Sequence, residues 1–154
     1  MAEKMNPRTQ RAREAIMDAT RKLVSKRPVA DISLTEIAEE AGVSRPTIYN
    51  QFKDTPTLVA ATSEHEMRML FAKIDEQLPQ GDDEEYLHRL MELFVEGVYE
   101  QRSFSRNAMW GPSATEITAA VVELLSDKMR QGYIGKQLEQ KAPEQLEDCL
   151  DAIS

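Results

Sequence analysis

A glycine at position 42 separates two short segments of helical periodicity, and this arrangement constrains the fold more than any other feature of the 154-residue sequence. The preceding Ser33-Leu34-Thr35-Glu36 predicts a helix start, in which the serine hydroxyl accepts the Glu36 N–H and the Glu36 carboxylate reaches back. Gly42 tolerates the left-handed conformation that closes a helix. Ala41-Gly42-Val43-Ser44 therefore predicts a helix end, a tight turn and the N-cap of the next helix.

The two helices on either side of this turn have the lengths found in helix-turn-helix motifs. The second is expected from about Arg45 to Phe52, with Ile48 and Phe52 buried. Ala38 is small enough to let the two helices pack closely, and Val43 would fill the angle between them. The outward face of the second helix would then be free to enter the major groove of DNA.

Helix signals also occur on both sides of the motif. The first helix is expected to begin after Asn6, with Pro7 at its first position, and to end before Pro28. Later helices are expected over about 54–77, from 82 or 83 through 98, over 103–110, from a second capping box at 113–116, and from 143 onward. No strand pattern occurs, and helix-forming residues dominate, so the sequence predicts an all-α fold.

Apolar residues recur at helical spacing in the two long helices of the middle of the chain. The stripes expected to face the core are Met67, Leu70, Phe71, Ile74 and Leu78 in the earlier helix, and Leu87, Leu90, Met91, Phe94 and Val98 in the later one.

Charge is distributed unevenly along the chain, whose net charge is −8. Residues 1–53 carry ten Lys/Arg and seven Asp/Glu, a net of +3, whereas residues 54–154 carry nine and twenty, a net of −11. Such asymmetry is expected if a DNA-facing end is joined to a body that stays off the phosphates, although acidic residues also simply solvate helix surfaces. We therefore expect a helix-turn-helix domain over 1–53 and a helical effector-binding and dimerisation domain over 54–154.

The sequence contains no membrane span and no secretory signal, and it has a single cysteine, Cys149. These features predict a cytoplasmic protein. His65, His88 and Cys149 do not share a metal-ligand spacing, and no catalytic or nucleotide-loop motif occurs, so we expect no enzyme activity, no metal and no cofactor.

The run from Leu34 to Lys53 closely resembles the signature of the TetR (tetracycline-repressor) family, and the resemblance extends over roughly residues 8 to 60. It implies a homodimer of all-helical subunits, each with a three-helix DNA-binding head and a body that often binds a small effector. In such proteins the effector usually releases the operator. Dimerisation in the family chiefly uses the last two helices, of which only the start of one, 143–154, is present. The chain is therefore expected to be truncated, or its dimer to be unusually small.

The resemblance and the exposed face of the motif together nominate DNA contacts. The candidates are Thr35, Ser44, Arg45, Pro46, Thr47, Tyr49, Asn50 and Lys53. Arg45 can chelate guanine or clamp a phosphate, Pro46 can contact a thymine methyl, and Asn50 can pair with adenine. Helix capping is an equal explanation for Ser44 and Thr35, and packing against the first helix is the alternative for Tyr49.

Two features of the sequence concern further contacts with the DNA backbone. The family commonly has Ser-Lys where this chain has Asp54-Thr55, so Lys53 is expected to replace the missing phosphate clamp. Arg8, Arg11 and Arg13 either reach DNA as an arm or form a solvated basic surface.

Thioether and aromatic side chains of the body suit an apolar or amphipathic effector, with ordinary core packing as the alternative for each. The candidates for such a pocket are Met67, Phe71, Met91, Phe94, Met109, Trp110 and Tyr133.

The predicted function is sequence-specific DNA binding by a transcriptional repressor. It would act as a homodimer on a near-palindromic operator in double-stranded DNA. The alternative is a helical small-molecule-binding or interaction protein that lacks operator specificity.

Overall fold

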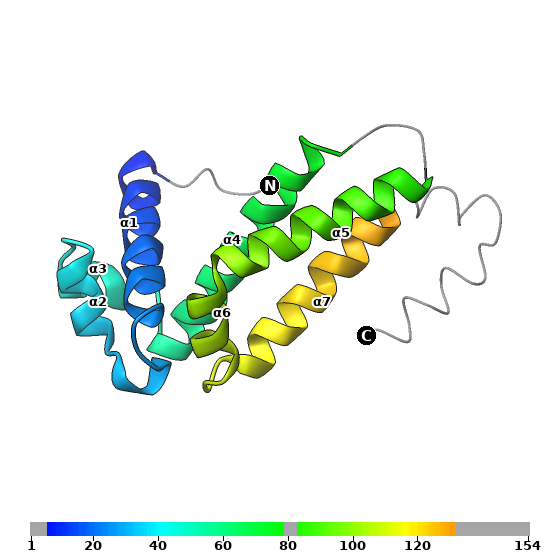
Figure 1. Ribbon diagram of the computed structural model, residues 1–154. Helices are drawn as coiled ribbons and strands as arrows, with labels where there is room; N and C mark the ends of the chain where they lie inside the picture. The colour runs from blue at the N-terminus through cyan, green and yellow to red at the C-terminus, as the bar shows by residue number, and fades with distance from the viewer. Residues whose placement is uncertain (1–5, 79–82, 132–154) are drawn as a thin grey trace. The chain divides into compact units, whose positions relative to one another are not determined.

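The computed structural model describes residues 6–78 and 83–131. Within these ranges the chain forms seven α-helices, one short 3₁₀ helix and no strand, which confirms the all-α prediction. The elements are α1 (Pro7–Val24), η1 (Val29–Asp31), α2 (Leu34–Glu40), α3 (Arg45–Tyr49), α4 (Thr55–Asp75), α5 (Asp83–Glu100), α6 (Arg102–Met109) and α7 (Ala114–Gln131) (Figure 1). The helix expected from residue 143 lies outside the described residues. None of the described helices has the length and apolar character needed to cross a membrane.

Two compact units make up the chain. Of the described residues, the first comprises 6–65 and 101–117, and the second comprises 66–78, 83–100 and 118–131. Helix α4 contributes its first half to one unit and its second half to the other.

In the first unit, α1 packs against α2 and α6, and α2 packs against α3. Asn6 caps α1 as predicted, since its side chain accepts the Arg8 N–H at 3.0 Å, and Pro7 occupies the first helical position. The buried side chains of α1 include Ile16, Ala19 and Val24. Asn107 of α6 donates to the Val24 carbonyl at 2.6 Å, so a helix 83 residues further along the chain closes the open end of α1.

The turn between α2 and α3 has the predicted geometry. Gly42 has a φ of +66°, and the Val43 N–H bonds to the Ala38 carbonyl at 3.0 Å across the turn. Ala38 is buried where the two helices meet. Ile48 and Phe52 are buried as expected, although α3 itself ends at Tyr49, earlier than predicted.

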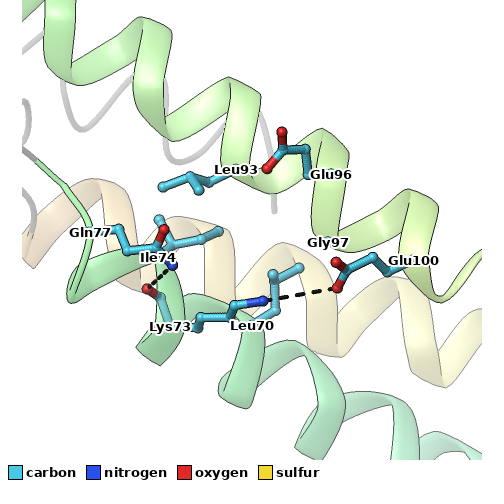
Figure 2. A pocket seen from close by; sticks show the side chains of 8 residues that line it. All are labelled: Leu70, Lys73, Ile74, Gln77, Leu93, Glu96, Gly97 and Glu100. Carbon is cyan, nitrogen blue, oxygen red and sulfur yellow. Dashed lines mark hydrogen bonds and ion pairs between the residues drawn. The ribbon is translucent and has the colours of Figure 1, made fainter.

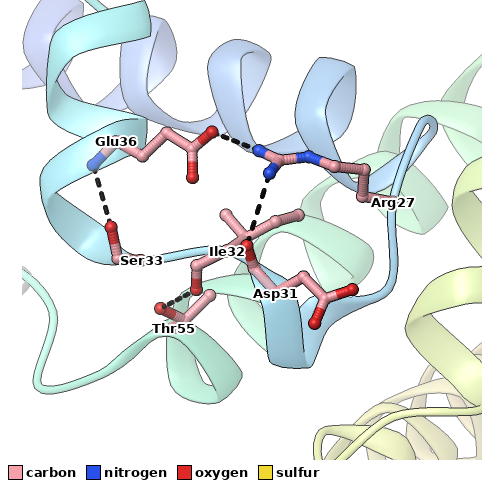
Figure 3. Close-up of polar contacts among 6 residues, drawn as sticks. All are labelled: Arg27, Asp31, Ile32, Ser33, Glu36 and Thr55. Atoms are coloured by element: carbon pink, nitrogen blue, oxygen red, sulfur yellow. Dashed lines mark hydrogen bonds and ion pairs between the residues drawn. The ribbon is translucent and has the colours of Figure 1, made fainter.

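The start of α2 corrects one prediction. The Ser33 hydroxyl accepts the Glu36 N–H at 3.2 Å, but the Glu36 carboxylate pairs with Arg27 instead of returning to the Ser33 N–H. Arg27 also lies 3.5 Å from the Asp31 carbonyl, and the Thr55 hydroxyl donates to the Ile32 carbonyl at 3.1 Å (Figure 3). A guanidinium from the chain segment after α1 thus takes the carboxylate that a capping box would have used.

In the second unit, Phe71 and Ile74 of α4, Leu93 of α5 and Leu124 of α7 form a buried cluster. Met67, Leu70 and Leu78 pack against it, which confirms the predicted stripe on α4. The Phe71 and Phe94 rings are stacked, with centroids 6.0 Å apart.

The stripe predicted on α5 is only partly correct. Leu90 and Phe94 pack against the cluster, but Met91 is 55% exposed and Val98 is 36% exposed, while Leu93 is buried instead. Gly97 also faces α4, because a Cβ added there would lie 2.2 Å from Leu70 Cδ1. The face of α5 that packs on α4 is therefore rotated from the predicted one; the Leu87 side chain lies outside the described part.

The predicted capping box before α7 does not form. The Ser113 hydroxyl is buried without a hydrogen-bond partner, although the Ile117 N–H bonds to the Ser113 carbonyl at 3.0 Å. The Ser113 side chain is buried by tertiary packing and does not cap α7. Ile117 and Leu124 of α7 are buried.

Candidate nucleic-acid interface

The first turn of α3 is held by its own hydroxyl groups. The Ser44 hydroxyl accepts the Thr47 N–H at 3.4 Å and lies 2.7 Å from the Thr47 hydroxyl. Ser44 is exposed and Thr47 is half-buried. The capping role predicted for Ser44 is confirmed, and the two hydroxyls hold one another at the amino end of the helix.

The outer side of α3 carries Arg45, Pro46 and Tyr49, and Asn50 follows as the C-cap residue; all four are exposed. Ile48, on the opposite side of this short helix, is completely buried. One side of α3 is thus anchored in the first unit while the other stays open to a partner.

Tyr49 connects the outer sides of α3 and α2. Its side chain is 54% exposed, and its hydroxyl lies 3.5 Å from the Thr35 hydroxyl. Thr35 is half-buried at the start of α2. Two hydroxyl groups that lie fourteen residues apart in the sequence are therefore adjacent, and both can donate to one acceptor such as a phosphate oxygen.

Lys53 is exposed just before α4, next to a helix cap. The Asp54 carboxylate accepts the Thr57 N–H at 2.8 Å. Hydrogen bonds with Thr57 lower the pKa of Asp54 below its ordinary value, and the charge of Lys53 lowers it further. The departure from the family pattern at this position thus supplies an N-cap to α4.

Each of the three carboxylates of α2 is paired with a cation. Glu36 pairs with Arg27, Glu40 with Lys22, and Glu39 with Arg45, whose Nη2 donates to the Glu39 Oε1 at 3.4 Å. The hydrogen bond from Lys22 is the main cause that lowers the pKa of Glu40 below its ordinary value.

Sequence reasoning missed two of the contacts near these candidates. The Arg13 guanidinium lies 4.8 Å from the centroid of the Phe52 ring, a cation–π contact that ties α1 to the end of the motif. Glu39, which holds Arg45, was not singled out either. The short turn at Gly42 is the sequence signal for the pair of Glu39 and Arg45, because it folds the last turn of α2 back toward the first turn of α3.

The family model for "Bacterial regulatory proteins, tetR family" matches residues 16–62, which include both helices of the motif and every candidate DNA contact. Over this segment the chain is similar to the TetR family of regulatory proteins.

Curated relatives match part of the chain. It is 39% identical over 67 residues to an uncharacterized HTH-type transcriptional regulator of Mycobacterium tuberculosis, covering 44% of this chain and 33% of that one. It is 43% identical over 58 residues to the HTH-type transcriptional regulator AcrR of Shigella flexneri, covering 38% and 27%. The matched segment thus spans about a third or less of the length of these relatives.

Solved structures resemble the chain over nearly its whole length. The fatty acid degradation regulator FadR from Bacillus halodurans has a TM-score of 0.63 at 21% identity, covering 97% of this chain and 83% of that one. A TetR-family transcriptional regulator from Haemophilus influenzae has a TM-score of 0.59 at 17% identity, covering 96% and 97%. At these identities the similarity establishes the fold.

The residues predicted to line an effector pocket have different surroundings. Phe71 is buried in the core of the second unit, and Met67 and Phe94 pack against that core. Met91 of the second unit is 55% exposed, whereas Met109 and Trp110 of the first unit are 42% and 89% exposed. Tyr133 lies outside the described residues.

A small hollow of about 60 Å³ does occur in the second unit, between α4 and α5. Its lining comprises Leu70, Lys73, Ile74, Gln77, Leu93, Glu96, Gly97 and Glu100 (Figure 2). Lys73 and Glu100 lie 3.9 Å apart across it. None of the predicted effector residues lines this hollow, so the predicted pocket stays a prediction.

Proposed function

We propose that this protein is a sequence-specific DNA-binding transcriptional regulator of the TetR family that recognises a near-palindromic operator as a homodimer. The observation that carries the proposal is the two-sidedness of α3. Ile48 is fully buried, while Arg45 and Tyr49 on the same short helix are exposed. A helix anchored on one side and open on the other suits insertion into a major groove.

Base recognition is assigned to the outer side of α3. Arg45 can donate two hydrogen bonds to the O6 and N7 of a guanine, which is the commonest specific contact in the major groove. Asn50 can pair with adenine, and Pro46 offers an apolar surface to a thymine methyl.

Backbone contacts are assigned to the hydroxyl and ammonium groups at the edges of the motif. The adjacent hydroxyls of Thr35 and Tyr49 suit a phosphate oxygen, and Ser44, Thr47 and Lys53 provide further donors nearby. These contacts would fix the register of the protein on the duplex without reading its sequence.

We further propose that the protein is a cytoplasmic repressor and that a small apolar or amphipathic effector releases it from the operator. The proposal is supported by the similarity of residues 16–62 to the TetR family and by the apolar core of the second unit, which Phe71 helps to form and against which Met67 and Phe94 pack. A ligand that separates these side chains would have to shift α4 or α5, which carry them.

The test is selection of bound duplexes from a random pool, followed by titration of the selected duplex and of a random duplex at several salt concentrations. A specific regulator yields a recurring near-palindromic sequence and binds it at least about a thousand-fold more tightly than random DNA. A helical small-molecule-binding protein without operator specificity yields no recurring sequence and no such preference, and this result would overturn the proposal.

A further inference from the structure

We propose that Glu39 is a positioning residue that makes Arg45 selective for bases over phosphates; this rests on the proposed function. Arg45 Nη2 and Glu39 Oε1 lie 3.4 Å apart. The Arg45 and Glu39 side chains are 66% and 68% exposed, so the pair lies open on the surface that α3 presents.

Among the candidate DNA contacts, Arg45 is the cation held by a carboxylate of the motif itself. The other carboxylates of α2, Glu36 and Glu40, pair with Arg27 and Lys22, which are not candidate contacts. Glu39 therefore differs from Glu36 and Glu40 because the cation that it pairs with is a candidate DNA contact.

The carboxylate acts differently on the two kinds of DNA contact. Attraction to a phosphate depends on net charge, and a paired Glu39 offsets the charge of Arg45. Recognition of guanine depends on the direction of N–H donors, and a guanidinium has five of them in a fixed plane. Arg45 can keep one N–H on Glu39 and still direct two others at O6 and N7.

Glu39 thus penalises sequence-independent binding more than operator binding, and it holds the plane of the guanidinium before DNA arrives. An exposed ion pair contributes little to the stability of the fold, so its removal is expected to change DNA selectivity and not folding.

The experiment compares Glu39→Gln with wild type on the selected operator and on random duplex, across a salt series. The variant is expected to bind random duplex more tightly, to lower the ratio of operator to random affinity by about five-fold, and to steepen the salt dependence on random duplex by about 0.9 in log K against log salt. Far-ultraviolet circular dichroism and thermal unfolding confirm that it is folded.

Glu40→Gln is the matched control, because it removes the same charge from the neighbouring position but releases Lys22 in place of Arg45. It is expected to leave the ratio unchanged. In an Arg45→Ala background, Glu39→Gln is expected to have no further effect on the ratio. The inference is overturned if Glu40→Gln lowers the ratio equally, if Glu39→Gln leaves it unchanged, or if its effect persists without Arg45.

These outcomes are separate from a failure of the proposed function. If the wild-type protein has no preferred duplex, the proposed function and the inference fail together. If wild type prefers its operator and Glu39→Gln keeps that preference, only the inference fails.

Discussion

At the scale of single residues, the exposed side of α3 combines groups of different chemical character within a few positions. Arg45 supplies a delocalised charge with directed donors, whereas Tyr49 supplies a hydroxyl that already lies 3.5 Å from the Thr35 hydroxyl. Because directed donors can distinguish bases and a lone hydroxyl on the sugar-phosphate backbone cannot, substitutions at the two positions are expected to have different signatures.

Replacing Arg45 with alanine is expected to weaken operator binding by about 1–3 kcal/mol and to relax selectivity at one base pair, because a bidentate contact to guanine is lost. Fluorescence titration with the selected operator and its single-base variants measures both effects. Arg89→Ala on α5 is the control, since Arg89 pairs with Glu92 outside the head. Unchanged operator affinity in Arg45→Ala would remove the role assigned to this side chain.

Replacing Tyr49 with phenylalanine removes one hydroxyl and keeps the ring. Operator and random duplex are expected to lose affinity by a similar factor, since a contact with the sugar-phosphate backbone is common to both. Tyr99, which is 64% exposed on α5, provides the matched control as Tyr99→Phe. Equal affinities for wild type and Tyr49→Phe would show that the hydroxyl does not contact DNA.

At the scale of elements, α2 and α3 are short helices. Nearby side chains cap their N-termini, and contacts between residues distant in the sequence hold their orientations. Ser33 and Ser44 cap α2 and α3, and Asp54 contributes a cap to α4. Pairs such as Glu36 with Arg27 then fix neighbouring segments to one another. Helices of five and seven residues are too short to be stable in isolation, so the caps, the ion pairs and the buried side chains stabilise them.

Gly42→Ala is expected to destabilise the protein by about 1–2 kcal/mol, because alanine is strained at the φ of +66°. No atom lies within 4 Å of a Cβ placed there, so the loss arises from the backbone and not from a clash. Asparagine tolerates this conformation better, and Gly42→Asn is expected to lose less. Urea unfolding measures both variants, and an alanine variant as stable as wild type would contradict the assignment of strain.

The Asp54 cap predicts a dependence of stability on pH. Its pKa is lowered in the folded protein by hydrogen bonds with Thr57, so its contribution is complete above the unfolded value of about 3.9 and disappears as the pH falls through the lower folded value. The stability difference between wild type and Asp54→Ala is therefore expected to be constant near neutral pH and to shrink in the acidic range.

Chemical denaturation over a pH series measures this difference. Asp31→Ala is the control, because the exposed Asp31 side chain caps no helix in the described chain. A gap between wild type and Asp54→Ala that widens as the pH falls would contradict the prediction.

At the scale of the whole molecule, residues 1–53 carry a net charge of +3 and residues 54–154 carry a net charge of −11. The positive charge of residues 1–53 would attract DNA, and the negative charge of residues 54–154 would be repelled by it. Recognition of a near-palindromic site would then depend on how the proposed homodimer spaces its two DNA-binding domains.

The proposed homodimer would place its two α3 helices about 34–36 Å apart, one turn of DNA. Inserting five base pairs between the half-sites turns one half-site to the opposite side of the duplex and is expected to abolish tight binding. Inserting the same five base pairs outside the half-sites is the control and is expected to have no effect. A gel-shift titration measures both, and tight binding to the first duplex would exclude a dimer with a fixed spacing.

The sequence determined the features of this protein that depend on neighbouring residues. The caps at Asn6 and Ser33, the turn at Gly42 and the buried Ile48 were all predictable, because a cap or a left-handed glycine involves residues only a few positions apart. The candidate DNA contacts came from the same run and from its resemblance to the TetR family.

Tertiary structure decided which of several possible partners each side chain takes. Glu36 binds Arg27 instead of its own helix, Ser113 is buried instead of capping α7, and Leu93 replaces Met91 in the core. In each case local sequence allows both states, and the free energy of contacts with distant segments selects one. The pairing of Glu39 with Arg45 differs from these cases, since the local turn at Gly42 brings that carboxylate to the guanidinium.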